Sequence, residues 1–95
     1  MPLLTELIEQ SGIEAALHNA DGVEVSGITA DSRRVRAGDA FVALRGTAVD
    51  GTQFIQQAAE AGAAAIVTHA DVSRDGLTIP FVQASEPRLA LSKLA

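Results

Sequence analysis

The sequence contains no cysteine, no tryptophan and no tyrosine, and its only large aromatic residues are three phenylalanines. Without cysteine the chain has no disulfide framework, no thiolate metal site and no cysteine nucleophile. Stacking on a nucleobase can then come only from phenylalanine or arginine. The core must be built mostly from alanine, valine, leucine and isoleucine, so we expect modest stability for a domain of 95 residues.

Long apolar runs and an excess of basic charge are also missing. No run approaches the roughly 20 apolar residues that span a bilayer, and the first ten residues hold two glutamates and no basic residue, unlike a signal peptide. The formal net charge of −5 disfavours non-specific binding to nucleic acid or to an anionic membrane, because such binding needs a basic face. We therefore expect a cytoplasmic protein whose partners include neither nucleic acid nor a membrane.

Common catalytic patterns are absent as well. The chain lacks the phosphate-binding pattern G-x-x-x-x-G-K-[ST] and the dinucleotide-binding pattern G-x-G-x-x-G, and its only lysine is Lys93. His18 and His69 are isolated, with no second ligand at a spacing typical of metal sites. The sequence therefore predicts no catalytic residue and no metal site in this chain.

The chain does contain a series of short elements typical of one α/β domain. Its composition, 47% apolar and 20% charged, is that of a folded domain. Residues 13–24 show only a turn signal at 19–22. The patterns predict helices over 3–11, from Asp50 to Gly62 and from Ser85 onward, and strands over 25–29, 40–44, 63–68 and 80–84. This order predicts a small, mostly parallel or mixed sheet flanked by helices, with the strand at 40–44 buried on both faces.

The last predicted helix has no visible end. Its leucines at 89, 91 and 94 stay in phase up to Ala95, and no glycine, asparagine or proline closes it. We therefore expect the chain to be a fragment, cut within or just after a helix that leads into another domain. The alternative is a natural C-terminus that frays.

Turn-forming polar residues gather between Ile28 and Ile55, beside predicted strand ends, where ligand sites tend to be built. Asp31 and Ser32 favour a compact turn, because their side chains readily bond nearby backbone N–H groups. Ser32 and the neighbouring backbone can also present donors and acceptors to a ligand. Arg33 suits either a phosphate or a carboxylate of the protein itself.

Two further features lie in the same stretch. Arg34 and Arg36 extend the basic cluster begun by Arg33, and this cluster is either a solvated surface or a local attractor of an anionic ligand. The glycine-rich loop 46–51 leads into a helix, whose N-terminus favours anions. Asp50 in the capping position would compete with a phosphate there, so we expect the loop to meet a neutral edge of a ligand, such as a nucleobase. An ordinary loop-to-helix connection is the alternative.

The combined pattern resembles a known family. The run I-T-A-D-S-R-R-V-R-A-G-D-A-F-V-A-L-R-G-T-A-V-D-G-T-Q-F-I, followed by A-A-E-A-G-A-A-A-I-V, is similar to the N-terminal domain of the Mur ligases. These ATP-dependent enzymes add amino acids to UDP-N-acetylmuramoyl (UDP-MurNAc) peptides during peptidoglycan synthesis. The D-S-R turn, the G-D-x-F-V-A-L-x-G strand and the D-G-x-x-F-I helix start are specific in this order, and the resemblance covers nearly the whole chain.

The resemblance implies that residues 1–95 form one domain that holds the UDP end of the UDP-MurNAc-peptide substrate. By position, Ala30 and Ser32 would contact uridine. A second contact stretch would comprise Thr47, Ala48 and Val49, and Arg33 is a candidate anion contact. The family often has histidine or another polar residue where Thr47 or Ala48 stands, which points to backbone rather than side-chain contacts there.

The resemblance also implies what lies outside this chain. The family's phosphate loop, metal-binding residues and carbamylated lysine belong to a central domain, which with ATP and Mg²⁺ activates the substrate carboxylate as an acyl phosphate. The fragment itself would need no cofactor and would catalyse nothing. Its partners would be the substrate and the remaining domains of the ligase.

Within the family, the branch that adds the third residue, meso-diaminopimelate or L-lysine, is the more similar. The branch that adds D-Ala-D-Ala is the alternative, and a non-catalytic binding module is another.

Overall fold

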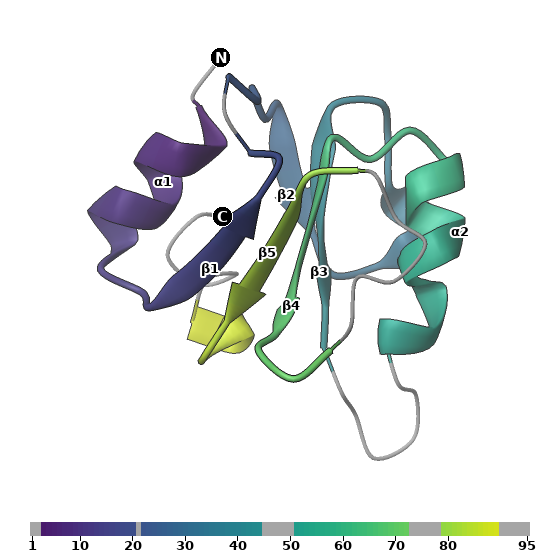
Figure 1. Ribbon diagram of the computed structural model, residues 1–95. Coiled ribbons are helices and arrows are strands. Elements are labelled where there is room, and N and C mark those ends of the chain that lie inside the picture. The colour runs from purple at the N-terminus through teal and green to yellow at the C-terminus, as the bar shows by residue number, and fades with distance from the viewer. Residues whose placement is uncertain (1–2, 21, 45–50, 73–78, 90–95) are drawn as a thin grey trace.

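The computed structural model describes residues 3–20, 22–44, 51–72 and 79–89 (Figure 1). The chain runs from helix α1 through two strands, a 3-10 turn, a third strand, a second 3-10 turn continued by helix α2, and two more strands. The elements are α1 (Leu4–Ser11), β1 (Ala15–His18), β2 (Gly27–Thr29), η1 (Ser32–Arg34), β3 (Asp39–Ala43), η2 (Gly51–Phe54), α2 (Ile55–Glu60), β4 (Ala65–His69) and β5 (Phe81–Ala84).

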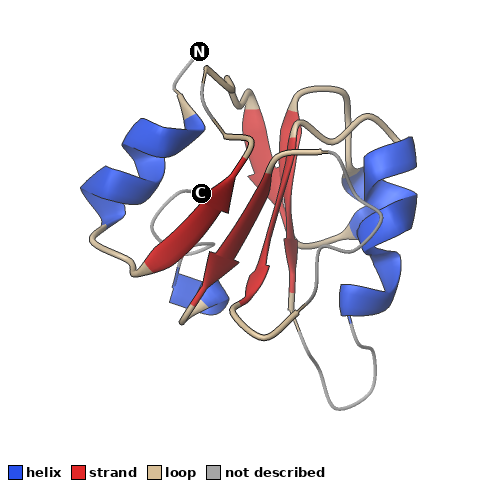
Figure 2. Cartoon of the chain, in the orientation of Figure 1, coloured by secondary structure: helices blue, strands red, loops and turns tan. Residues whose placement is uncertain are grey.

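The five strands form one mixed sheet in the order β1-β5-β4-β3-β2 (Figure 2). Strands β2, β3, β4 and β5 are parallel to one another, and β1 pairs with β5 in the antiparallel sense. This arrangement confirms the predicted α/β class and the mostly parallel sheet. Because β2 and β3 are parallel neighbours, the segments that leave their carboxyl ends begin at the same edge of the sheet.

Helices cover both faces of the sheet, as Figure 1 shows. Successive side chains of a strand point to opposite faces, and this alternation sorts the core into two clusters. Val42, Val67 and Val82 pack on the face that carries α1. Phe41 and Phe81 pack on the face that carries α2. Residues 40–43 are all buried, so the prediction that this strand is covered on both sides is confirmed.

Helix α1 follows the predicted amphipathic pattern. Leu4 and Ile8 lie one turn apart and are buried. Gly12 ends the helix in the left-handed conformation, with φ of 74°, and its N–H donates to the carbonyl of Glu9 at 3.3 Å. Such a conformation favours glycine because a side chain there is strained.

Several predicted elements differ from the structure, most by one or two residues at an end, and three differences are larger. Strand β1 lies in the stretch for which the sequence predicted only a turn. The strand predicted over 25–29 begins at Gly27, because Val25 leaves the ladder and is buried in the α1-side core. The helix predicted after Asp50 starts as the 3-10 turn η2 and becomes α-helical at Ile55.

Residues 87–89 are helical, as expected, and Asp50, Leu91 and Leu94 lie outside the described residues. In the part of the chain that is described, no helix is long and apolar enough to cross a bilayer.

Candidate functional site

The turn that follows β2 is fixed by hydrogen bonds among residues 29–34. The Thr29 hydroxyl oxygen accepts from the N–H of Asp31 at 3.1 Å. Asp31 caps the 3-10 turn η1, where its Oδ1 accepts from the N–H of Arg33 at 2.9 Å and its carbonyl accepts from the N–H of Arg34 at 3.0 Å. The predicted compact turn is therefore present, and its backbone is held before any ligand arrives.

Arg33 pairs with Asp31 through two parallel hydrogen bonds. Arg33 Nε lies 3.1 Å from Asp31 Oδ1, and Arg33 Nη2 lies 3.1 Å from Asp31 Oδ2. The hydrogen bonds from the Arg33 side chain, followed by the one from its backbone N–H, hold the pKa of the Asp31 carboxyl below its ordinary value. Asp31 in turn raises the pKa of the Arg33 guanidinium. Of the two uses predicted for Arg33, the internal ion pair is the one seen, and the phosphate contact stays a prediction.

Removing the Arg33 side chain should raise the pKa of Asp31. The carboxyl titrates below its ordinary value of about 3.9 in the folded chain, so its contribution to stability is present above that pH and is lost as the pH falls through the lowered pKa. In Arg33→Ala the pKa of Asp31 is less depressed, so its contribution to stability should begin to be lost at a higher pH. Carboxyl ¹³C NMR of Asp31 measures this shift. Arg34→Ala is the matched control, because Arg34 acts on Asp31 only through its charge and is the last of the causes; an equal shift in both variants would contradict the assignment.

The predicted uridine contacts Ala30 and Ser32 lie on this turn. Ala30 is exposed and Ser32 is half-buried. The Ser32 hydroxyl has no hydrogen-bond partner among the described residues. Both residues stand at the carboxyl end of β2, and their availability to a ligand agrees with the predicted role without testing it.

The second predicted stretch, Thr47, Ala48 and Val49, lies outside the described residues. Its two flanks are described. Gly51 N–H donates to the carbonyl of Leu44 at 2.7 Å, which brings together the ends of the loop 45–50. Leu44 directly follows β3, the parallel neighbour of β2. The two predicted contact stretches, 30–32 and 47–49, therefore follow adjacent strands whose carboxyl ends lie at the same edge of the sheet.

An open, basic groove of about 620 Å³ runs along β2. The β2 strand forms one side, and the segment that connects it to β3 forms the other. The residues lining this β2 groove are Gly27, Ile28, Thr29, Arg33, Arg34, Val35, Arg36 and Asp39. The groove thus adjoins the turn that carries Ser32 and gathers the three arginines that the sequence placed in one cluster.

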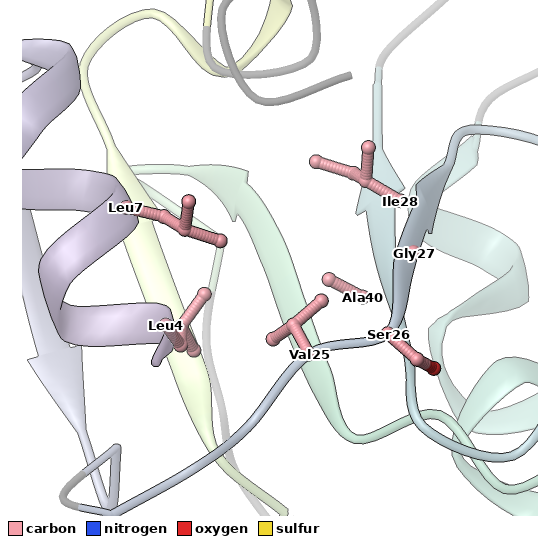
Figure 3. A pocket seen from close by; sticks show the side chains of 7 residues that line it. All are labelled: Leu4, Leu7, Val25, Ser26, Gly27, Ile28 and Ala40. Atoms are coloured by element: carbon pink, nitrogen blue, oxygen red, sulfur yellow. The ribbon is translucent and has the colours of Figure 1, made fainter. Parts of the chain in front are cut away.

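Two other hollows fit the predicted ligand less well. Figure 3 shows an apolar cavity of about 120 Å³ between α1 and β2, where Leu4 and Leu7 face Val25 and Ile28. It is much smaller than the roughly 300–1,000 Å³ of typical ligand pockets. A groove of about 560 Å³ lies where β4 and β5 end, lined by residues 85–89 and His69, and it contains none of the predicted contacts.

The described residues do not form a metal centre. No group of three His, Asp or Glu side chains among them is placed to hold an ion.

Two supporting residues were missed by sequence reasoning. Thr29 holds the Asp31 N–H, and its spacing two residues before Asp31 is a hydroxyl-turn signal that could have been read. Gly51 holds Leu44 through its backbone, and only the three-dimensional closure of the loop reveals that contact.

A model of the Mur ligase family, described as its catalytic domain, matches residues 24–95. The chain belongs to the Mur ligase family. Its fold agrees with this membership: a structure of MurF from Acinetobacter baumannii superposes with a TM-score of 0.80 and 26% identity, over 99% of this chain and 20% of that one. MurF from Thermotoga maritima in complex with ADP gives a TM-score of 0.59 at 29% identity, over 76% of this chain and 16% of that one.

Curated relatives of this Mur ligase chain share one description. A protein of Bradyrhizobium diazoefficiens is 46% identical over 85 residues, which are 88% of this chain and 17% of that protein. A protein of Streptomyces coelicolor is 40% identical over 94 residues, 97% of this chain and 18% of that protein. Both are described as UDP-N-acetylmuramoyl-L-alanyl-D-glutamate–2,6-diaminopimelate ligases. The chain spans less than a fifth of the length of these relatives.

Proposed function

We propose that this chain is the N-terminal, substrate-holding domain of a cytoplasmic ligase that adds diaminopimelate to UDP-MurNAc-L-Ala-D-Glu in peptidoglycan synthesis. The observation that carries the proposal is the identity of 40% and 46% to two diaminopimelate ligases over nearly the whole chain. The rest of the ligase would supply the sites for ATP, Mg²⁺ and the incoming amino acid. In the whole enzyme, ATP and Mg²⁺ activate the carboxylate of the substrate.

The chain's own contribution is to bind the nucleotide end of the substrate. A uracil ring offers carbonyl acceptors and one N–H donor along its edge. The Ser32 hydroxyl can donate and accept, and the backbone at Ala30 adds further polar groups. The three hydrogen bonds made by Asp31 and Thr29 fix the turn in advance, which lowers the entropy lost on binding. Phe41 and Phe81 are fully buried, so neither is available to stack on the base.

An NMR titration of the chain with UDP-MurNAc-L-Ala-D-Glu tests this function. We expect shifts confined to residues 29–33 and 46–50, seen also in part with UMP and not with ATP. A well-folded sample without shifts would contradict binding by this chain. Repeating the titration on a longer chain that includes the following domain would show whether that domain completes the site.

Replacing Ser32 with alanine should weaken substrate binding by about 0.5–1.5 kcal/mol, the contribution of one hydrogen bond. Isothermal titration calorimetry or the NMR titration measures the dissociation constant. Ser26→Ala is the matched control, because Ser26 is an exposed serine before β2, at the other end of the strand from Ser32. An unchanged dissociation constant in folded Ser32→Ala would remove this hydroxyl from the site.

A second candidate is the ligase that adds D-Ala-D-Ala. It is favoured by the likeness to the Acinetobacter baumannii and Thermotoga maritima MurF structures. Both ligases would hold UDP-MurNAc in the same way, so the turn alone does not separate them. Assaying the whole ligase with diaminopimelate and with D-Ala-D-Ala as the amine does.

A further inference from the structure

A cluster of three basic residues stands out on this acidic chain. Three of its seven basic residues, Arg33, Arg34 and Arg36, lie within four positions, while the chain as a whole carries a formal charge of −5. All three are exposed, and all three line the β2 groove.

The three arginines are not equivalent. Arg33 donates through Nε and Nη2 to the two oxygens of the Asp31 carboxylate, so one edge of its guanidinium is already paired. Arg34 and Arg36 are held only through their backbone: Arg34 N–H donates to the Asp31 carbonyl at 3.0 Å, and Arg36 N–H donates to Asp39 Oδ2 at 3.1 Å. In the described part of the chain, neither of these two guanidinium groups has a partner.

The acidic groups near the groove leave it net positive. Asp31 is paired with Arg33, and Asp39 is the only carboxylate that lines the groove. One oxygen of Asp39 already accepts the Arg36 N–H. An anion that enters the β2 groove therefore meets two open guanidinium groups against one partly occupied carboxylate.

We infer that Arg34 and Arg36 form the subsite for the phosphates of the nucleoside diphosphate, and that Arg33 is a positioning residue. The inference rests on the proposed function. Ser32 and Arg34 are the first and last residues of the same 3-10 turn. The turn that carries Ser32 borders the β2 groove through Arg33 and Arg34, so phosphates attached to a nucleoside held at Ser32 can enter this groove, where a guanidinium fork matches two phosphate oxygens.

The two roles predict different ligand dependence. Arg34 and Arg36 contact only the phosphates, so their loss should leave the binding of uridine unchanged. Arg33 acts by holding Asp31 and the turn, so its loss should weaken the binding of uridine and of UDP by the same factor. Comparing the binding of uridine with that of UDP in each variant therefore distinguishes a phosphate contact from a residue that supports the turn.

The test compares dissociation constants of the chain for uridine, UMP and UDP, by NMR titration at low and at high salt. For UDP we expect a loss of about threefold in Arg34→Ala and in Arg36→Ala, and of about tenfold in the double variant. Uridine binding should not change in any of the three. The salt dependence of UDP binding should fall in the double variant, because fewer ionic contacts remain to be screened.

Arg88→Ala is the control for net charge, because Arg88 lies beyond β5 and does not line the β2 groove. Equal losses of UDP affinity in Arg88→Ala and in the double variant would overturn the inference, as would a double variant that binds UDP like the wild type. Weaker binding of uridine in the double variant would also overturn it. If the folded wild type binds neither uridine nor UDP, the proposed function itself fails. That result differs from one in which the wild type and the double variant bind UDP equally well, which would overturn only the role of these arginines.

Discussion

Replacing Phe41 with alanine is expected to destabilise the domain by about 3–5 kcal/mol. Phe41 lies in β3 and is fully buried. Its ring packs in the cluster on the α2 side, which includes Ile55, Ile66 and Phe81. The surrounding strands are hydrogen-bonded on both sides of β3, so they cannot collapse into the space that the ring would leave.

The expected decrease in the free energy of unfolding is large compared with the total stability of a small domain. Domains of this size are stable by about 5–15 kcal/mol, and a small aliphatic core puts this one toward the lower end. We therefore expect Phe41→Ala to be substantially unfolded or to melt far below the wild type. Urea denaturation followed by circular dichroism measures the difference.

Leu17→Ala provides the comparison. Leu17 is also an apolar residue on a strand, but β1 is an edge strand and the side chain is 37% exposed. Its truncation should cost less than about 1.5 kcal/mol, because little area returns to water. A Phe41→Ala variant no less stable than Leu17→Ala would mean that the ring is not packed as the structure shows.

The central strands could be predicted from the sequence because their signals are local. The run 40–44 is continuously apolar and bounded by turn residues, as expected for a strand covered on both faces. The same holds for 63–68 after Gly62, whose φ of 102° ends α2. These segments are apolar enough to be buried in any compact fold, so their strand conformation can be predicted without knowing which strands they pair with.

Strand β1 could not be predicted in the same way. Its sequence, Ala-Ala-Leu-His, has neither β-branched residues nor a clear alternation, and alanine is depleted in strands. Its conformation comes from pairing with β5, more than sixty residues later in the chain. A contact between His18 Nε2 and Gln83 Oε1 at 2.8 Å ties the two strands together. Only the tertiary structure brings these side chains within reach.

The candidate site was partly predictable for a related reason. The residue types Asp31 and Ser32 predict a turn, and that turn is present, but the side chains that hold it are those of Asp31 and Thr29, and not that of Ser32. The choice between the two uses of Arg33 depended on where the Asp31 carboxylate points, which the sequence does not encode locally. The closure of the next loop depended on Gly51, which looks like any other glycine before a helix until its neighbour Leu44 is seen.

Replacing Gly51 with alanine is expected to weaken both the fold and substrate binding. A Cβ at this position would lie 2.7 Å from the carbonyl oxygen of Leu44 and 2.9 Å from its nitrogen. Both atoms are backbone, so relief requires β3 and η2 to separate. The 2.7 Å hydrogen bond between Gly51 N–H and the Leu44 carbonyl would lengthen or break. Overpacking of this kind costs about 1–3 kcal/mol.

The effect on binding follows because Leu44 and Gly51 flank the stretch 47–49, which is proposed to meet the nucleotide. Moving these flanks displaces the whole loop, so we expect affinity for UDP-MurNAc-L-Ala-D-Glu to fall about tenfold or more, the equivalent of one or two hydrogen bonds. Gly12→Ala is the control: Gly12 has φ of 74° and open space around an added Cβ. That variant should lose about 1 kcal/mol of stability from backbone strain and none of its affinity. Equal affinity in Gly51→Ala and Gly12→Ala at matched stability would show that the loop does not reach the substrate, and would leave the turn at Ser32 and the β2 groove to hold it.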